Sequence, residues 1–279
     1  MNKNRRFFLI GTGSFAVSLL LSSQQRVATS ATLLAQRSPN ALKVGVNPVP
    51  HGEILAFVQK NLATAAGLNL EIINFDDYVQ PNVALNDKQI GANYFQHVPY
   101  MENYNKERGT NIVAVVSVHI EPLGVYSKRV KSLPQVADRA TVSIPNDAVN
   151  QGRALKLLQD RQLIKLKDKV GVNATVRDIA QNSKKLKFAE LDAAQLPRSL
   201  DDVDLAVING NYALQIGLKP NKDALALESA KGNPYANVLS VLQGEEKDPN
   251  IQTLAKLLTS PQVKKFITDK YQGAVIPAF

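Results

Sequence analysis

A strand–helix–strand pattern that begins at residue 42 constrains the fold more than any other feature of this sequence. Leu42–Asn47 alternates like a short strand, Glu53–Ala66 repeats apolar residues with the spacing of one helix face, and Leu70–Phe75 is a second strand. Gly67 stands where a helix C-cap glycine is expected, and Pro48–Gly52 is predicted to be a turn. Because strands joined by a covering helix run parallel, the pattern predicts an α/β fold with a parallel sheet.

The alternation of strands and helices continues through the chain and restarts once. The remaining predicted strands are 90–95, 112–120, 125–127, 141–144, 186–190, 205–208 and 238–242, and the remaining predicted helices are 78–85, 151–159, 194–199, 251–258 and 261–271. We therefore expect two α/β lobes, with crossings near Glu121–Val125 and Val238–Leu242. Residues 41–123 and 241–279 would form lobe 1, and residues 124–240 would form lobe 2. A cleft between two lobes is a favoured ligand site, and two crossings can act as a hinge.

The first forty residues are predicted to be a signal peptide and linker rather than part of the fold. Lys3, Arg5 and Arg6 form a positive start, and an uncharged, mostly apolar or small run follows. The paired arginines are similar to a twin-arginine export signal, but paired arginines also occur in ordinary secretory signals, so both export routes stay open. We expect an exported, periplasmic or cell-surface protein, although an uncleaved membrane anchor is the alternative.

Composition excludes several kinds of chemistry. The chain has no cysteine, so we expect no disulfide, no thiolate catalysis and no lipid anchor on cysteine. The formal net charge is +9, but the charges are interspersed, which argues against nucleic acid as a partner. The sequence contains no phosphate-binding loop and no nucleophile elbow. His51, His97 and His119 are far apart and lack metal-ligand spacing, so neither a metal nor another cofactor is predicted.

The stretch Gln89–Met101 concentrates rings in a chain with only 6% aromatic residues. It contains Tyr94, Phe95, His97 and Tyr100, and Pro99 interrupts it. Because proline fits the first turn of a helix, the stretch is predicted to be a strand end that turns into a helix near Val98–Pro99. The rings could line a pocket or form an aromatic cluster in the core.

Several longer motifs appear in a fixed order. They are FDDYVQPNVAL at 75–85, GANYFQHVPYM at 91–101, EPLGVYSK at 121–128, IPNDAVNQGRAL at 144–155, AAQLPRSLDDVDLAVINGNYA at 193–213 and NPYANV at 233–238. In these motifs the chain resembles the NlpA-type, methionine-binding solute-binding proteins of bacterial ABC importers over essentially all of residues 42–279. The resemblance implies a periplasmic-binding-protein type II fold, with two lobes, a double crossover and a central ligand cleft.

The resemblance also implies a set of ligand contacts where the motifs match. These residues are Tyr78, Phe95, His97, Tyr100, Asn150, Arg153, Asn209 and Asn237. Arg153 would bind a carboxylate with its planar fork. The asparagine carbonyls could accept from an ammonium group, and the rings could enclose a thioether. Two departures from the family pattern are the missing N-terminal cysteine and Val149, which replaces a usual threonine.

The function implied by the resemblance is capture of methionine, with L-methionine preferred, and its delivery to a separate permease and ATPase. We expect a monomer that is not an enzyme and has no catalytic residues. The alternatives are a binding protein for another amino acid or a methionyl dipeptide, and an enzyme on the same two-lobed fold.

Overall fold

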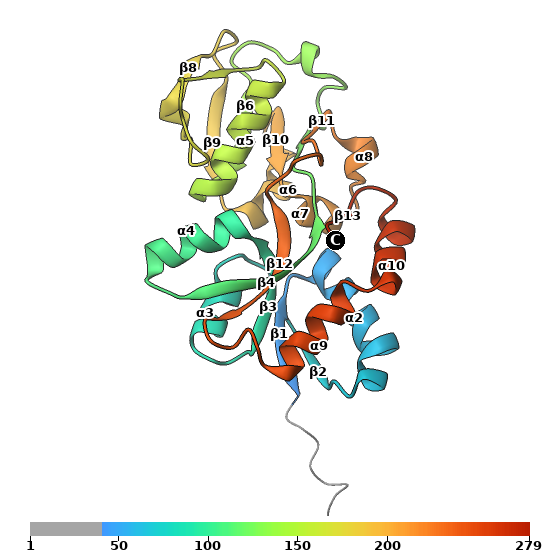
Figure 1. Ribbon diagram of the computed structural model, residues 1–279. Coiled ribbons are helices and arrows are strands. Elements are labelled where there is room, and N and C mark those ends of the chain that lie inside the picture. The colour runs from blue at the N-terminus through green and yellow to red at the C-terminus, as the bar shows by residue number, and fades with distance from the viewer. Residues whose placement is uncertain (1–40) are drawn as a thin grey trace, which may run out of the picture. The chain divides into compact units, whose positions relative to one another are not determined.

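The computed structural model describes residues 41–279, and the predicted signal segment lies outside the described residues. Figure 1 shows two sheets with helices packed on their faces. In the described chain the first sheet has six strands in the order β13-β4-β12-β3-β1-β2, and the second has five in the order β11-β5-β10-β6-β9. This is the two-lobed α/β fold that the sequence predicts.

The first sheet is parallel at one edge and antiparallel at the other. β3 and β2 flank β1 in parallel, and β12 runs antiparallel to both β3 and β4. The strands are β1 (Leu42–Val46), β2 (Leu70–Asn74), β3 (Ala92–His97), β4 (Ile112–Ile120), β12 (Ala236–Leu242) and β13 (Ile276–Pro277). The parallel pair β1 and β2 confirms the strand–helix–strand prediction.

The second sheet has a parallel centre, where β9 and β10 flank β6, and it is extended by antiparallel β5 and β11. Its strands are β5 (Gly124–Tyr126), β6 (Thr141–Pro145), β9 (Lys187–Leu191), β10 (Leu205–Ile208) and β11 (Ala226–Leu227). A separate short ribbon pairs β7 (Lys165–Leu166) with β8 (Ile179–Gln181).

Helices cover both faces of each sheet (Figure 1). The α-helices are α2 (Glu53–Val58), α3 (Gln80–Asn86), α4 (Val98–Arg108), α5 (Ala148–Asp160), α6 (Leu196–Ser199), α7 (Gly210–Gln215), α8 (Pro220–Asp223), α9 (Pro249–Leu258) and α10 (Pro261–Tyr271). Helical backbone continues from α2 to Ala66, and Gly67 ends it with a φ of 70°. Among the described residues, no helix is long and apolar enough to cross a membrane.

Each sheet has its own hydrophobic core. Ile54 of α2, Leu254 of α9 and Ile267 of α10 pack with the first sheet in one cluster. Leu155 of α5 packs with Val142 on the second sheet in another cluster. Burying each such side chain contributes about 1.5–3 kcal/mol. Because the two cores are separate, each lobe can stay rigid while the region between them changes.

Two corrections to the sequence analysis concern connections. β12 pairs with β4 from Ala236 and with β3 from Asn237, so the predicted boundary between 240 and 241 falls inside a strand of the first sheet. The second crossing is therefore the segment 228–235, which follows β11. The predicted turn Pro48–Gly52 is a π-helical turn that leads directly into α2, with Val49 extended. The proline and glycine residues are typical of a turn, and Gly52, the last of them, is the N-cap of α2 with helical φ and ψ.

Candidate ligand-binding site

One cavity between the two lobes is lined by all eight predicted site residues. They are Tyr78, Phe95, His97, Tyr100, Asn150, Arg153, Asn209 and Asn237. The space between the atoms of the cavity, including the part open to solvent, is about 340 Å³, but the centre of a water molecule can occupy only about 20 Å³ of it. A ligand the size of an amino acid therefore requires the lobes to part or the lining side chains to shift.

Aromatic rings from the first lobe form one wall of the cavity. The ring centroid of Tyr78 lies 6.1 Å from that of Phe95 and 5.9 Å from that of Tyr100. β3 ends at His97 and α4 begins at Val98, as the sequence predicts. The Tyr78 hydroxyl donates to Asn211 Oδ1 at 2.5 Å, so this wall is joined to α7 of the second lobe.

A chain of polar groups crosses the cavity from His97 to Asn209. Asn150 Oδ1 accepts from His97 Nε2 at 3.3 Å and from Asn209 Nδ2 at 3.0 Å. His97 Nδ1 accepts from the backbone N–H of Tyr100, which leaves the proton on Nε2. Burial, with the nearby Arg153 charge, lowers the pKa of His97 to about 3, so the ring is neutral. Asn209 Oδ1 is buried and has no hydrogen-bond partner in the described chain.

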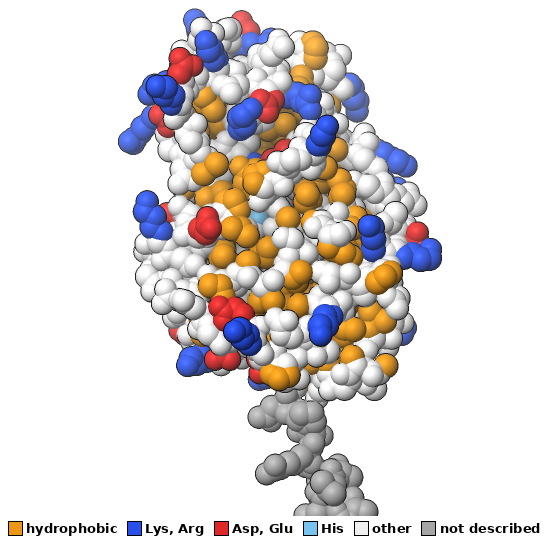
Figure 2. Space-filling model, viewed as in Figure 1, with side chains coloured by type: hydrophobic (Ala, Val, Ile, Leu, Met, Phe, Trp, Pro, Cys, Tyr) orange, Lys and Arg blue, Asp and Glu red, His pale blue; other side chains and the backbone are white. Residues whose placement is uncertain are grey.

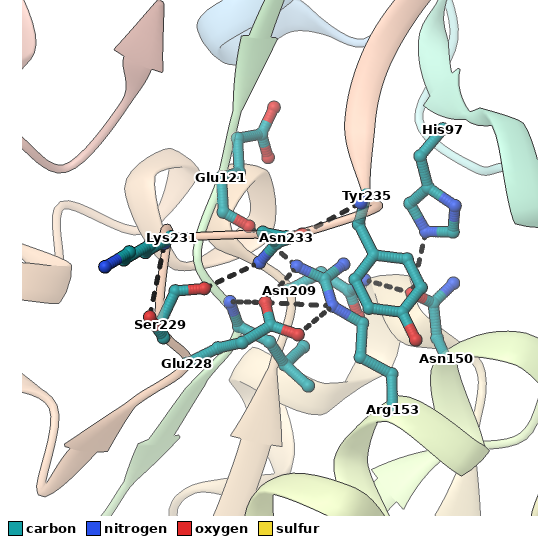
Figure 3. A network of polar contacts seen from close by, with 11 residues as sticks. His97, Glu121, Asn150, Arg153, Asn209, Glu228, Ser229, Lys231, Asn233 and Tyr235 are labelled. Carbon is teal, nitrogen blue, oxygen red and sulfur yellow. Dashed lines mark hydrogen bonds and ion pairs between the residues drawn. The ribbon is translucent and has the colours of Figure 1, made fainter. Parts of the chain in front are cut away.

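Arg153 lies on α5 and is held by both crossings (Figure 3). Its Nη2 donates to Glu228 Oε2 at 2.6 Å and to the Glu121 carbonyl at 2.9 Å, and Nε donates to both Glu228 oxygens. Its guanidinium stacks on Tyr235, with Cζ 4.3 Å from the ring centroid. Arg153 is thus a buried, ion-paired cation, and Nη1 is the nitrogen left without a partner among the described residues.

Asn237 is held differently from Asn209. His51 Nε2 lies 3.0 Å from Asn237 Oδ1, and His51 Nδ1 has no hydrogen-bond partner among the described residues. Burial lowers the pKa of His51 to about 4, so His51 is neutral and carries its proton on Nε2. The Asn237 carbonyl, predicted to be available for an ammonium group, therefore already accepts from His51.

The structure corrects the expectation that the histidines are far apart. His51 Nε2 and His119 Nε2 lie 3.2 and 2.6 Å from the same atom, Glu121 Oε1, and all three residues are buried. Donor atoms of this kind and spacing could hold a metal ion. Hydrogen bonds already engage three of the four ring nitrogens: His119 Nε2 bonds Glu121, His119 Nδ1 bonds the Tyr94 hydroxyl, and His51 Nε2 bonds Asn237 Oδ1.

Four further residues line the cavity without having been predicted as site residues: Gln96, Glu121, Gly210 and Asn211. Glu121 and Gly210 pack so closely that a Cβ on Gly210 would lie 2.7 Å from that of Glu121. All four stand inside the quoted motifs, and this position is the signal that could have found them. Gln96 and Gly210 are directly next to predicted site residues, whereas the motif that contains Glu121 includes no predicted site residue. Val149 is buried but does not line the cavity.

A larger and more open groove lies elsewhere on the second lobe, beside α5 and the β7–β8 ribbon. Its lining includes Lys156, Lys165, Lys167 and Lys169, all exposed. On the face shown in Figure 2, basic and acidic side chains are interspersed rather than gathered by sign. The cavity between the lobes is the better candidate, because the buried Arg153 and the buried amides of Asn150 and Asn209 converge on it.

Two α/β lobes, two crossings and an enclosed polar and aromatic cavity define a two-lobed solute-binding protein. The sequence profile of the NlpA lipoprotein family matches residues 42–279, and the chain belongs to that family. It is 42% identical over 243 residues to the D-methionine-binding lipoprotein MetQ of Escherichia coli strain K12, covering 86% of this chain and 89% of that protein. It is 40% identical over 247 residues to the methionine-binding lipoprotein MetQ of Bacillus subtilis, covering 87% and 90%.

Solved structures agree with this assignment. A nutrient-binding protein from Burkholderia cenocepacia bound to methionine is 48% identical, with a TM-score of 0.83, and the match covers 86% of this chain and all of that one. The crystal structure of the methionine-binding protein MetQ matches with a TM-score of 0.82 at 41% identity, covering 86% of this chain and 99% of that one.

Proposed function

We propose that this protein is an extracytoplasmic solute-binding protein that captures methionine and delivers it to an ABC-type permease. The observation that carries the proposal is the enclosed cavity, which combines a buried arginine and an unpartnered amide oxygen with a wall of three rings. The relatives that share the fold are named for methionine binding. The protein acts by binding and release, and not as an enzyme.

The chemistry of each part of the cavity matches a part of methionine. Arg153 Nη1 binds the carboxylate in this proposal, because Nε and Nη2 are already engaged by Glu228 and the Glu121 carbonyl. The unpartnered Asn209 Oδ1 accepts from the ammonium group. Tyr78, Phe95 and Tyr100 enclose the thioether, since sulfur–aromatic contacts contribute about 0.3–1.5 kcal/mol each.

Binding would couple to closure of the lobes. Hydrogen bonds cross from the first lobe to the second at Tyr78–Asn211, His97–Asn150 and Tyr212–Asp76. We propose that residues 41–123 with 236–279 move as one lobe against residues 124–235, with the two crossings as the hinge. The closed form would be the one that a permease with its ATPase recognises, because a ligand shifts a protein toward the state it binds better. We propose that the protein acts as a monomer.

The export route of the protein and its attachment to the membrane are considered next. The family and several relatives are named lipoproteins, in conflict with the expectation of no lipid anchor. This chain has no cysteine, and a lipid thioether needs a cysteine sulfur. We therefore propose export by the signal segment, with the twin-arginine route as its first candidate, and a mature protein without a cysteine-linked lipid.

The proposed function is tested by identifying what the protein carries. Ligand released by denaturing the purified protein is identified by mass spectrometry, and the refolded protein is titrated by calorimetry with L-methionine, D-methionine, norleucine and alanine. We expect methionine in the released fraction, tighter binding of methionine than of alanine, and no consumption of methionine on incubation. Release of another amino acid or a methionyl dipeptide would redefine the ligand, and turnover of methionine would refute the binding-protein proposal.

A further inference from the structure

The net positive charge of the described chain is concentrated in one stretch of the second lobe. Residues 156–187 contain nine lysines and arginines and three acidic residues, whereas the other described residues carry slightly more acidic than basic side chains. This stretch includes the C-terminal end of α5 and both strands of the β7–β8 ribbon. In Figure 1, β8 lies at the end of the second lobe that is far from the first sheet. None of these residues lines the ligand cavity, so the proposed function leaves this charge without a role.

Part of this charge surrounds the open groove beside α5 and the β7–β8 ribbon. Asp168 is the acidic residue among the residues that line the groove. Two of the four groove lysines pair with acids of the same stretch, Lys156 with Asp160 and Lys167 with Asp178. The other two, Lys165 and Lys169, have no ion-pair partner among residues 41–279. The groove therefore carries exposed positive charge that the protein itself does not neutralise.

The loop between β7 and β8 adds an exposed apolar side chain to the same groove. Val172 lines the groove and is 56% exposed, more than any other exposed large hydrophobic residue of the described chain. The loop backbone is fixed on α5, because a Cβ at Gly152 would collide with the Val172 carbonyl oxygen. Val170 packs against the core of the second lobe. An apolar side chain that is held in water beside cations is stabilised when it enters the apolar boundary of a bilayer.

We propose that this lysine surface, which comprises the four groove lysines and Val172, binds reversibly to anionic phospholipid headgroups. Lysine ammonium groups on flexible stems can follow headgroups that move within a membrane, and the valine can enter the bilayer interface. The groove lining that the structure describes contains no arginine, so it lacks the planar fork that suits the fixed carboxylates of an acidic protein. Because the lysine surface lies outside the ligand cavity, the inference does not depend on the identity of the solute.

The test measures how much of the purified protein sediments with vesicles. One set of vesicles contains phosphatidylglycerol and phosphatidylcholine in equal amounts, and the other contains phosphatidylcholine alone. The main variant combines Lys165→Gln, Lys167→Gln and Lys169→Gln. Each lysine near an anionic surface strengthens binding about fivefold, so the triple variant should bind the anionic vesicles up to about 100-fold more weakly than the parent. Salt at about 1 M, where the screening length is about 3 Å, should release the parent.

A matched control removes the same charge from the first lobe. It combines Lys106→Gln, Lys256→Gln and Lys264→Gln, three exposed lysines on α4, α9 and α10. This control should bind the anionic vesicles within about threefold of the parent. Val172→Ser should weaken vesicle binding and leave its salt dependence unchanged, because it removes an apolar contact and no charge. All variants share one N-terminus, so residues 1–40 contribute equally to each measurement.

Melting curves and a single substitution keep the test decisive. The replaced lysines are exposed, so the triple variant should melt close to the parent. If it does not, Lys169→Gln alone should still weaken vesicle binding about fivefold, because Lys169 has no ion-pair partner among residues 41–279.

Several results would overturn the inference. A parent that ignores both kinds of vesicle, or binds them equally, has no surface for anionic lipid. Equal weakening by the triple variant and by its control would assign the attraction to net charge rather than to the lysine surface. A parent that ignores the vesicles but binds immobilised polyglutamate, when the triple variant does not, would identify the surface as a site for acidic protein segments instead.

Discussion

Arg153 allows a stability effect and a binding effect to be separated in one experiment. Arg153→Met keeps most of the side-chain volume but removes the contacts to Glu228, the Glu121 carbonyl and the Tyr235 ring. Breaking a buried ion pair costs about 3–5 kcal/mol. The Glu228 side chain is 18% exposed and can be rehydrated, so we expect the low end, about 3 kcal/mol. For a domain of this size that corresponds to a fall in Tm of about 6–12 °C.

The same substitution should weaken methionine binding about tenfold to 150-fold, because Nη1 no longer binds the ligand carboxylate. Methioninol, which lacks that carboxylate, should lose much less affinity than methionine. Thermal unfolding without ligand measures the first effect, and calorimetric titration of both ligands measures the second.

Arg129→Met is the matched control for this substitution. Arg129 pairs with Asp204 at 3.1 Å, but the two side chains are 47% and 32% exposed. An exposed pair contributes about 0–1 kcal/mol, so this variant should melt close to the parent and bind methionine equally well. Unchanged methionine affinity and unchanged melting in Arg153→Met would refute the reasoning, because Arg153 would then be neither a structural nor a ligand-binding cation.

Three further results are expected. Phe95→Ala should weaken methionine more than alanine in parallel titrations, because the ring contacts the side-chain end of the cavity; equal weakening would remove Phe95 from the thioether wall. The free energy of unfolding should fall as the pH decreases from about 6.5, by up to about 1.4 kcal/mol per pH unit for each buried histidine, because the folded pKa values of about 3–4 lie below the unfolded value. A free energy of unfolding that stays constant between pH 7 and pH 5 would contradict the buried neutral rings. The intact mass of the native protein should match a chain cleaved near residues 32–40 without lipid, whereas a full-length, membrane-retained chain would support the uncleaved anchor.

The sequence predicted most of the first lobe because its signals are local. Apolar periodicity located β1, α2 and β2, and Pro99 marked the start of α4. Two-residue strands such as β11 and β13 carry no such signal. They form only because β5 and β4 offer an edge to pair with. The predicted lobe boundary between 240 and 241 was too late in the sequence for a related reason. Only the pairing of Ala236 with Ile120 shows that the chain has rejoined the first sheet by Ala236.

The membership of the site could be predicted from motifs, but the partners of its residues could not. Arg153 and Glu228 are 75 residues apart, and His51 and Asn237 are 186 residues apart. Neither Glu228 nor His51 belongs to any of the motifs that indicated the ligand contacts. The crossings bring these residues together, so their pairing is a property of the tertiary fold and not of any local pattern.

The two asparagines illustrate what the partners decide. In the sequence Asn209 and Asn237 are equivalent, because each amide can donate or accept. In the fold, Asn150 accepts from the Asn209 amide and leaves Asn209 Oδ1 free, whereas His51 donates to Asn237 Oδ1 and leaves the Asn237 amide to face other groups. Asn209 is thereby fixed as an acceptor suited to an ammonium group, and Asn237 as a donor suited to a carboxylate. His51 Nε2 also lies 3.2 Å from Glu121 Oε1, but its single proton is donated to Asn237, so the histidine that donates to the Glu121 carboxylate is His119. Two buried neutral histidines therefore orient two different polar groups, one an amide and the other a carboxylate.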